Sequence, residues 1–167
     1  MDRVTLDRIN LLHPKLRDEA NDLYADICKV FNRKVICRFT HTLRTFAEQR
    51  ELYARGRTKQ GSIVTQAREG FSYHNYGLAI DIALLIDRDN NWTYETLSYN
   101  TKSDSDQDGK SDWLEVVTLF KQYGWEWGGD WKFYDAPHFQ KTFGYSVRQL
   151  LDLHTKGKVD KNGYPLI

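Results

Sequence analysis

The sequence predicts a single α+β domain in which helices pack around a small antiparallel sheet. Segments with helical and strand-like patterns follow one another irregularly, without the regular strand–helix repeat of a doubly wound parallel sheet. The chain has 167 residues, of which 40% are hydrophobic and 14% aromatic. This length and composition suit one hydrophobic core. We therefore expect one domain over residues 1–167.

Local patterns predict the elements in chain order. Helical spacing of apolar residues predicts helices over residues 8–12, with Thr5 as the N-cap, and over residues 14–31. Thr45 and Glu48 form a capping-box pattern that opens a helix ending at Gly56. Two more helices are expected over residues 112–123 and from a Ser146 cap to residue 156. Runs of β-branched and aromatic residues predict strands over residues 35–40, 77–86 and 138–143.

Charge and hydropathy exclude several kinds of partner. The 24 basic and 23 acidic residues leave a net charge of +1, so the protein has no overall positive electrostatic field that would favour binding to nucleic acid. The N-terminus lacks an apolar segment, and the most apolar stretch, residues 78–86, is too short to cross a bilayer. We expect a monomer that is synthesised in the cytoplasm without a signal peptide and does not insert into membranes. Cys28 and Cys37 are expected as two small buried thiols rather than a disulfide.

Two segments, residues 72–81 and 124–140, concentrate residues that can do chemistry. A catalytic zinc takes three protein ligands and an open position for water, and His74, Asp81 and His138 would supply two imidazoles and one carboxylate. An ionised Asp81 inside an apolar strand needs a compensating cation or hydrogen-bond donors. From the residues alone, two interpretations stay open: a zinc site, or two ordinary histidines beside a hydrogen-bonded aspartate.

The two segments resemble the two signatures of one peptidase family. Residues 72–81 read Ser-Tyr-His-Asn-Tyr-Gly-Leu-Ala-Ile-Asp, with Ser72, His74, Gly77, Ala79 and Asp81 at the signature positions. Residues 127–131 followed by 135–140 resemble the second signature, and residues 44–53 resemble the segment that precedes both. The family is that of the zinc peptidoglycan peptidases, which includes D-alanyl-D-alanine peptidases and L-alanyl-D-glutamate endopeptidases. The second signature is similar to its endolysin-like branch.

The resemblance implies roles for individual residues. It implies that His74, Asp81 and His138 bind zinc in a cleft at the sheet, and that Asp135 is the general base. It also implies that Arg44 faces the substrate carbonyl as a catalytic residue. Ser72 and Gln49 are expected to bind substrate.

A separate motif predicts a calcium site in a loop inserted at residues 104–115. Its spacing fits the twelve-residue EF-hand loop, with an aspartate at the first position, a glutamate at the twelfth, and Gly109 at the turn. The alternative is a solvated acidic turn. The expected calcium ligands are Asp104, Asp106, Asp108, the carbonyl of Lys110, Asp112 and Glu115.

Together these inferences predict a bacteriolytic, endolysin-like zinc metallopeptidase. Its expected partners are peptidoglycan stem peptides, and the expected cleavage site is the L-alanyl–D-glutamate bond. It would act on the cell wall or in the periplasm after release from the cytoplasm. Two alternatives remain: a D-alanyl-D-alanine carboxypeptidase, and a non-catalytic wall module that binds zinc and calcium.

Overall fold

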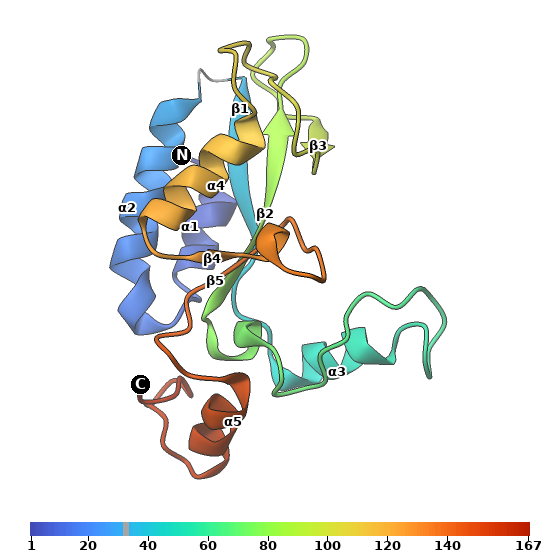
Figure 1. The fold of residues 1–167 in the computed structure, drawn as a ribbon, viewed down its shortest axis with the longest axis vertical. Coiled ribbons are helices and arrows are strands. Elements are labelled where there is room, and N and C mark those ends of the chain that lie inside the picture. The colour runs from blue at the N-terminus through green and yellow to red at the C-terminus, as the bar shows by residue number, and fades with distance from the viewer. Residues whose placement is uncertain (32–33) are drawn as a thin grey trace.

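The computed structural model, which describes residues 1–31 and 34–167, has the α+β architecture that the sequence predicts (Figure 1). Its α-helices are α1 (Arg3–Ile9), α2 (Pro14–Val30), α3 (Phe46–Ala54), α4 (Asp112–Gln122) and α5 (Val147–Thr155). Two 3₁₀ turns are η1 (Tyr73–Tyr76) and η2 (Gly128–Asp130). The strands are β1 (Val35–His41), β2 (Ala79–Ile86), β3 (Thr96–Ser98), β4 (Glu126–Trp127) and β5 (His138–Gln140).

Strand β2 organises the antiparallel sheet. The strand order is β1-β2-β5-β4, and β3 pairs with β2 off this path. One edge of β2 pairs with β1 along its length, whereas the other edge pairs with β5 at residues 79–81 and with β3 at residues 84–86. In this register, Asp81 is opposite His138 on one side and His41 on the other.

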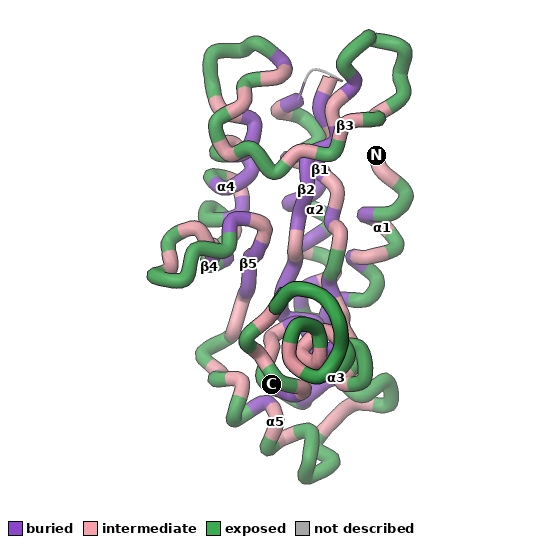
Figure 2. Tube along the Cα trace, turned by 90° about the vertical axis from the view of Figure 1, so that its right-hand side faces the viewer, coloured by how far each residue is buried: buried purple, intermediate pink, exposed green. Residues whose placement is uncertain are grey.

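The two faces of the sheet have different roles. Helices α1, α2 and α4 lie together on one side of it in Figure 1. Ile80, Ile82 and Leu84 of β2 point to that side and join the hydrophobic core with Trp113 and Phe120 of α4. Because side chains alternate along a strand, Asp81 points to the opposite face. Figure 2 views the molecule from this second side, where β2 and β5 run between α3 and the upper loops.

Several predicted elements are confirmed together with the physical reason for them. Thr45 and Glu48 form the capping box of α3, and Gly56 after its end has a φ of +70°. Ser146 and Gln149 form a second capping box at α5. The predicted helix over residues 14–31 is α2, and that over residues 112–123 is α4. Strand β5 is shorter than predicted and ends at Gln140, while β3, β4, η1 and η2 were not predicted.

The prediction for the first helix was wrong at both ends. Helix α1 starts at Arg3 and ends at Ile9, and its N-cap is Asp2 rather than Thr5. Thr5 lies inside the helix, where its hydroxyl donates to Asp2 and accepts from the backbone N–H of Phe39. Asp2 is preferred because Arg38 of β1 donates to both of its oxygens, at 2.9 and 2.8 Å. Sequence-local capping rules do not include such a distant partner.

Two further expectations concern the cysteines and membranes. Both cysteines are free thiols as expected, but Cys28 is exposed and only Cys37 is buried. Burial raises the pKa of the Cys37 thiol. Among the described residues, no helix combines the length and apolar character needed to cross a membrane.

The Asp2–Arg38 pair predicts a pH-dependent stability. Burial of Asp2 opposes its ionisation, but the hydrogen bonds from Arg38 and Thr5 hold its pKa below the ordinary value of 3.8. A lowered folded-state pKa stabilises the fold above the unfolded-state pKa, and this contribution disappears as the pH falls through the folded-state value. Asp2→Asn should lower the free energy of unfolding by about 1–2 kcal/mol at neutral pH, and by progressively less in acid.

Urea unfolding across this pH range measures the difference. Asp7→Asn is the matched control because its partner Arg3 is exposed, and such a pair contributes little. A difference between Asp2→Asn and wild type that stays constant from neutral pH to strong acid would contradict the prediction.

Candidate metal and catalytic site

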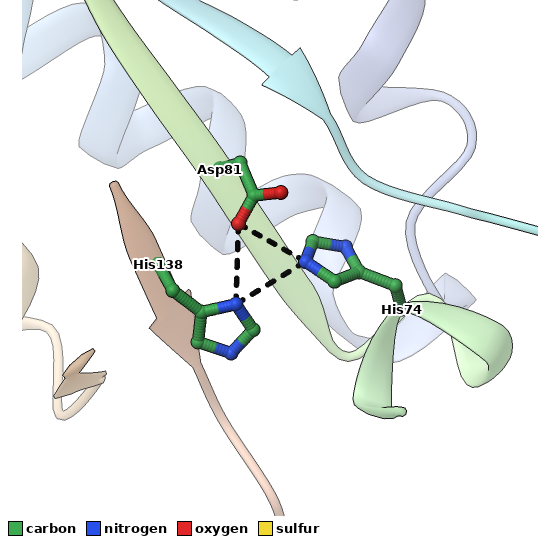
Figure 3. Close-up of side chains that lie close together, drawn as sticks. All are labelled: His74, Asp81 and His138. Atoms are coloured by element: carbon green, nitrogen blue, oxygen red, sulfur yellow. Dashed lines mark hydrogen bonds and ion pairs between the residues drawn. The ribbon is translucent and has the colours of Figure 1, made fainter. Parts of the chain in front are cut away.

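Three side chains from distant parts of the chain meet on the open face of the sheet (Figure 3). Nε2 of His74 lies 3.1 Å from Oδ1 of Asp81 and 3.2 Å from Nδ1 of His138. The third side of the triangle, from Nδ1 of His138 to Oδ1 of Asp81, is 3.1 Å. Tetrahedral ligands at about 2.0 Å from zinc are separated by about 3.3 Å, so the triangle matches three corners of a zinc site.

The ring of His74 is fixed by the end of β1. Its Nδ1 lies 2.8 Å from the carbonyl oxygen of Thr42, which only accepts hydrogen bonds. Nδ1 therefore carries the proton in the neutral ring, and Nε2 presents a lone pair toward Asp81 and His138. Just after η1, Gly77 has a φ of +67°, and a Cβ there would lie 2.6 Å from the backbone nitrogen of His13. This tight turn brings His74 back over the strand that carries Asp81.

The ring of His138 is fixed by two residues that the sequence analysis missed. Gln140 donates to Glu126 at 2.8 Å, which turns its amide oxygen toward Nε2 of His138 at 3.2 Å. Nε2 then donates to Gln140, and Nδ1 presents a lone pair to the shared point. Gln140 follows His138 by two residues on a strand, so their shared face was a signal that could have identified it.

The three converging atoms thus have lone pairs and no proton among them when both imidazoles are neutral. Such an arrangement is repulsive in a buried site unless a cation occupies the shared point. Two nitrogen donors and one carboxylate oxygen form a donor set that zinc takes in catalytic sites. The partners at Thr42 and Gln140 orient the rings in the way that outer hydrogen bonds orient metal-bound histidines.

Asp81 also contacts the predicted catalytic arginine. Nη2 of Arg44 lies 3.5 Å from Oδ2 of Asp81, the oxygen that faces away from the histidines. Burial opposes ionisation of Asp81, but positive charge on the facing imidazoles of His74 and His138 outweighs it and holds the pKa of this carboxyl well below its usual range. A zinc ion at the shared point would act on the carboxyl in the same direction. The carboxylate is therefore charged at neutral pH.

Gln49 reaches the site only through Arg44. Its amide oxygen accepts from Nη1 of Arg44 at 3.0 Å, and its amide nitrogen donates to the carbonyl of Ala67 at 2.7 Å. Gln49 has no exposed surface, so the geometry fits a residue that positions Arg44 rather than one that contacts substrate. Ser72 is partly exposed at the start of η1, and its carbonyl accepts from Asn75. A substrate-binding role for Ser72 stays a prediction.

Asp135 lies in the loop between η2 and β5, and a close backbone approach shapes this loop. Its N–H donates to the carbonyl of Gly128 at 3.0 Å. A Cβ on Gly128 would lie 2.4 Å from the carbonyl oxygen of Asp135, so the loop can close only over glycine. Among the described residues, no hydrogen bond or ion pair engages the Asp135 carboxylate. Partial removal of the carboxyl from water raises its pKa, because desolvation disfavours the charged form, and a raised pKa makes the anion a stronger base.

Aromatic side chains flank this side of the site. The Trp131 ring lies 5.2 Å from the His138 ring, and Trp127 donates to the carbonyl of Ala136 at 2.7 Å. Phe133 and Tyr134 are exposed in the same loop. Trp125, in contrast, is buried in the core.

The predicted calcium loop lies away from the zinc triangle, at the N-terminus of α4. Carboxylate oxygens of Asp104, Asp106 and Asp108 lie within 4.8 Å of one another. Asp104 accepts from the backbone N–H groups of Asp108 and Gly109, at 3.1 and 3.0 Å. Oδ1 of Asp112 and Oε2 of Glu115 are buried and have no hydrogen-bond partner among residues 1–31 and 34–167.

Comparison with known proteins gives consistent matches. Residues 65–141 match the family model described as D-alanyl-D-alanine carboxypeptidase. The chain is 48% identical over 130 residues to the peptidoglycan L-alanyl-D-glutamate endopeptidase CwlK of Bacillus subtilis, covering 77% of this chain and 72% of that protein. The fold resembles the crystal structure of the L-Ala D-Glu endopeptidase ChiX of Serratia marcescens. That match has a TM-score of 0.54 and 21% identity, and it covers 86% of this chain and 90% of the other.

The geometry predicts one zinc ion per chain. His138→Ala removes one of three ligands and should abolish stoichiometric zinc, measured by elemental analysis after dialysis. Gln140→Ala should retain the site but weaken zinc affinity by about 10–100-fold, the usual effect of losing a partner that orients a ligand. His154→Ala, on the exposed side of α5, is the control and should bind zinc as wild type does. Full zinc occupancy in His138→Ala would show that this histidine is not a ligand.

Proposed function

The chain belongs to the zinc peptidase family of D-alanyl-D-alanine carboxypeptidases and peptidoglycan L-alanyl-D-glutamate endopeptidases, and we propose that it cleaves the L-alanyl–D-glutamate bond of peptidoglycan stem peptides. The observation that carries the choice of bond is the 48% identity to the endopeptidase of Bacillus subtilis. The His74–Asp81–His138 triangle beside Asp135 supports a hydrolytic zinc site in this chain.

In the proposed hydrolysis, the zinc site and Asp135 have separate roles. Zinc, when bound by His74, Asp81 and His138, supplies a water of lowered pKa and polarises the scissile carbonyl. The free carboxylate of Asp135 takes a proton from the attacking water and delivers it to the nitrogen of the leaving D-glutamyl residue. Its exposed position in the loop before β5 gives it access to both atoms.

Arg44 has a different task from Asp135. Its ion pair with Asp81 and its hydrogen bond to Gln49 hold the guanidinium at the edge of the site. A guanidinium has five N–H donors, so donors remain for the substrate carbonyl oxygen as negative charge develops on it. Gln49 keeps Arg44 in this orientation through the carbonyl of Ala67.

The family model's description favours one alternative, a D-alanyl-D-alanine carboxypeptidase. It would use the same zinc chemistry on a C-terminal residue, so the products separate the two activities. We further propose that the chain acts on the cell wall in an endolysin-like role, which the 48% identity to a peptidoglycan endopeptidase supports. We propose that it does so as a monomer, because His74, Asp81 and His138 of a single chain form the site.

We also propose that residues 104–115 bind one calcium ion. Buried carboxylate oxygens without partners destabilise a fold, and Asp112 and Glu115 each have one. Burial and the charge of Asp108 raise the pKa of Glu115, as expected where carboxylates repel one another. Nζ of Lys110 lies 3.3 Å from Asp108 and 3.6 Å from Glu115, and so compensates part of this charge. Calcium would satisfy the carboxylates together, with the Lys110 carbonyl as a further ligand.

Purified peptidoglycan tests the proposed reaction. Wild type should release fragments with a new N-terminal D-glutamate, identified by end-group labelling and mass spectrometry. Asp135→Asn should keep one zinc per chain and lose about 10²–10⁴-fold in rate, because it removes a general base and not a ligand. Release of free D-alanine alone would favour the carboxypeptidase, and no release at all would favour a non-catalytic wall module.

Calorimetry tests the calcium site. Zinc-loaded wild type should bind one calcium ion, and Asp104→Ala/Glu115→Ala should not bind it. Asp89→Ala/Glu95→Ala is the matched control, since it also removes two acidic residues from an acidic group. It should bind calcium as wild type does. An absence of binding heat in wild type would mean that the loop is an acidic turn.

A further inference from the structure

A pair of basic side chains beside the zinc triangle has no part in the chemistry described above. His41, the last residue of β1, is opposite Asp81, just after a shift of the β1–β2 register between Phe39 and His41. Cross-strand neighbours in antiparallel pairs have Cα atoms about 5 Å apart. His41 is exposed, and no hydrogen bond or ion pair engages its ring among the described residues. An unused imidazole therefore borders the zinc ligand on its β1 side.

Arg8 is on α1, the helix that lies along the free edge of β1 and hydrogen-bonds to it. The carbonyl of Arg8 accepts from the hydroxyl of Thr42 at 2.8 Å, and Thr42 is the residue that fixes the ring of His74. Because Thr42 directly follows His41, this hydrogen bond brings the backbone of Arg8 close to that of His41. The guanidinium is partly exposed and makes no ion pair within the part of the chain that the structure describes.

The site is consequently asymmetric across the strands. On the β1 side are Arg8 and His41, which we call the basic rim. On the β5 side is the loop with Asp135, the exposed rings of Phe133 and Tyr134, and one cation, Lys132. The other charged groups near the basic rim are engaged. Arg44 contacts Asp81 and Gln49, and Glu48 caps α3 through Thr45.

The proposed substrate brings an anion close to the zinc triangle. In an L-alanyl–γ-D-glutamyl linkage, the D-glutamyl α-carboxylate is on the carbon that carries the scissile nitrogen, two bonds from it. That carboxylate enters a site that already holds the charges of Asp81 and Asp135, and an uncompensated anion there is costly. Binding therefore requires a donor or cation that the site does not already use.

We propose that Arg8 and His41 bind the α-carboxylate of the D-glutamyl residue and so make the enzyme selective for stem peptides in which this group is free rather than amidated. The inference rests on the proposed function and deepens it. A guanidinium can donate two hydrogen bonds to one carboxylate, and the imidazole adds one more donor. An amide in place of the carboxylate has no charge and turns an N–H₂ group toward these donors.

The test compares two synthetic peptides, L-alanyl-γ-D-glutamyl-L-lysine and its counterpart with D-isoglutamine. Wild type should cleave the carboxylate peptide with a kcat/KM about tenfold higher or more, the range expected for one charge-assisted hydrogen bond. Arg8→Gln and His41→Gln should each reduce this ratio, mainly by raising KM for the carboxylate peptide, and should leave the amide peptide nearly unaffected. Arg8→Lys keeps the charge and should retain part of the preference.

Lys132→Gln is the matched control, since it removes one positive charge from the opposite side of the site. It should keep the wild-type ratio. As a readout that needs no turnover, calorimetry should show that wild type binds the product γ-D-glutamyl-L-lysine more tightly than the isoglutaminyl product, and that Arg8→Gln does not.

Equal cleavage of both peptides by wild type would overturn the inference while leaving the proposed function intact. Loss of the preference in Lys132→Gln but not in Arg8→Gln or His41→Gln would also overturn it, because the carboxylate would then face the β5 side. Cleavage of neither peptide would overturn the proposed function and this inference with it.

Discussion

The active face of this protein depends on the convergence of three lone pairs at one point. Each comes from a different structural context: His74 from a 3₁₀ turn, Asp81 from a central strand and His138 from the strand beside it. The two rings present lone pairs because Thr42 and Gln140 occupy their other nitrogens. Without these partners the rings could rotate or change tautomer, and the affinity for zinc would fall. The hydrogen bonds behind the triangle therefore tune the affinity of the site that its three corners form.

That convergence explains features of the fold that look unrelated. Gly77 permits the tight turn that returns His74 to β2, and the β2–β5 register places His138 opposite Asp81. Gly128 allows the loop before β5 to close, which brings Asp135 to the site three residues ahead of His138. Helices α1, α2 and α4 lie on the other face, where β2 contributes to the core. The sheet thus uses one face for stability and leaves the other for chemistry.

Sequence-based prediction succeeded where the interacting residues are close together in the sequence and failed where they are far apart. The capping box at Thr45 and the N-cap at Ser146 each involve residues within one helical turn, and both were predicted correctly. The convergence of His74, Asp81 and His138 was predictable because metal chemistry requires particular residue types, and the family resemblance placed them; their role as zinc ligands stays a prediction. The start of α1 was mispredicted because Arg38, far along the chain, selects Asp2 as the cap. Gln49 was assigned to substrate, and only the fold shows it buried behind Arg44.

Two groups of acidic residues lie outside the triangle: Asp87 with Asp89 and Glu95, and the loop of residues 104–115. They differ in whether their buried carboxylate oxygens accept hydrogen bonds, and this difference distinguishes a candidate cation site from a turn. Asp87 is buried, but both of its oxygens accept from backbone N–H groups, at 3.2 Å from Asn91 and 3.0 Å from Trp92. These backbone N–H groups already compensate the charge of the Asp87 carboxylate, so binding a cation there would give little further stabilisation. In residues 104–115, by contrast, Asp112 and Glu115 each keep a buried oxygen without a donor. The same criterion, acceptor atoms that converge without protons, applies to the triangle of His74, Asp81 and His138, and it separates that triangle and the proposed calcium loop from an acidic turn of similar composition.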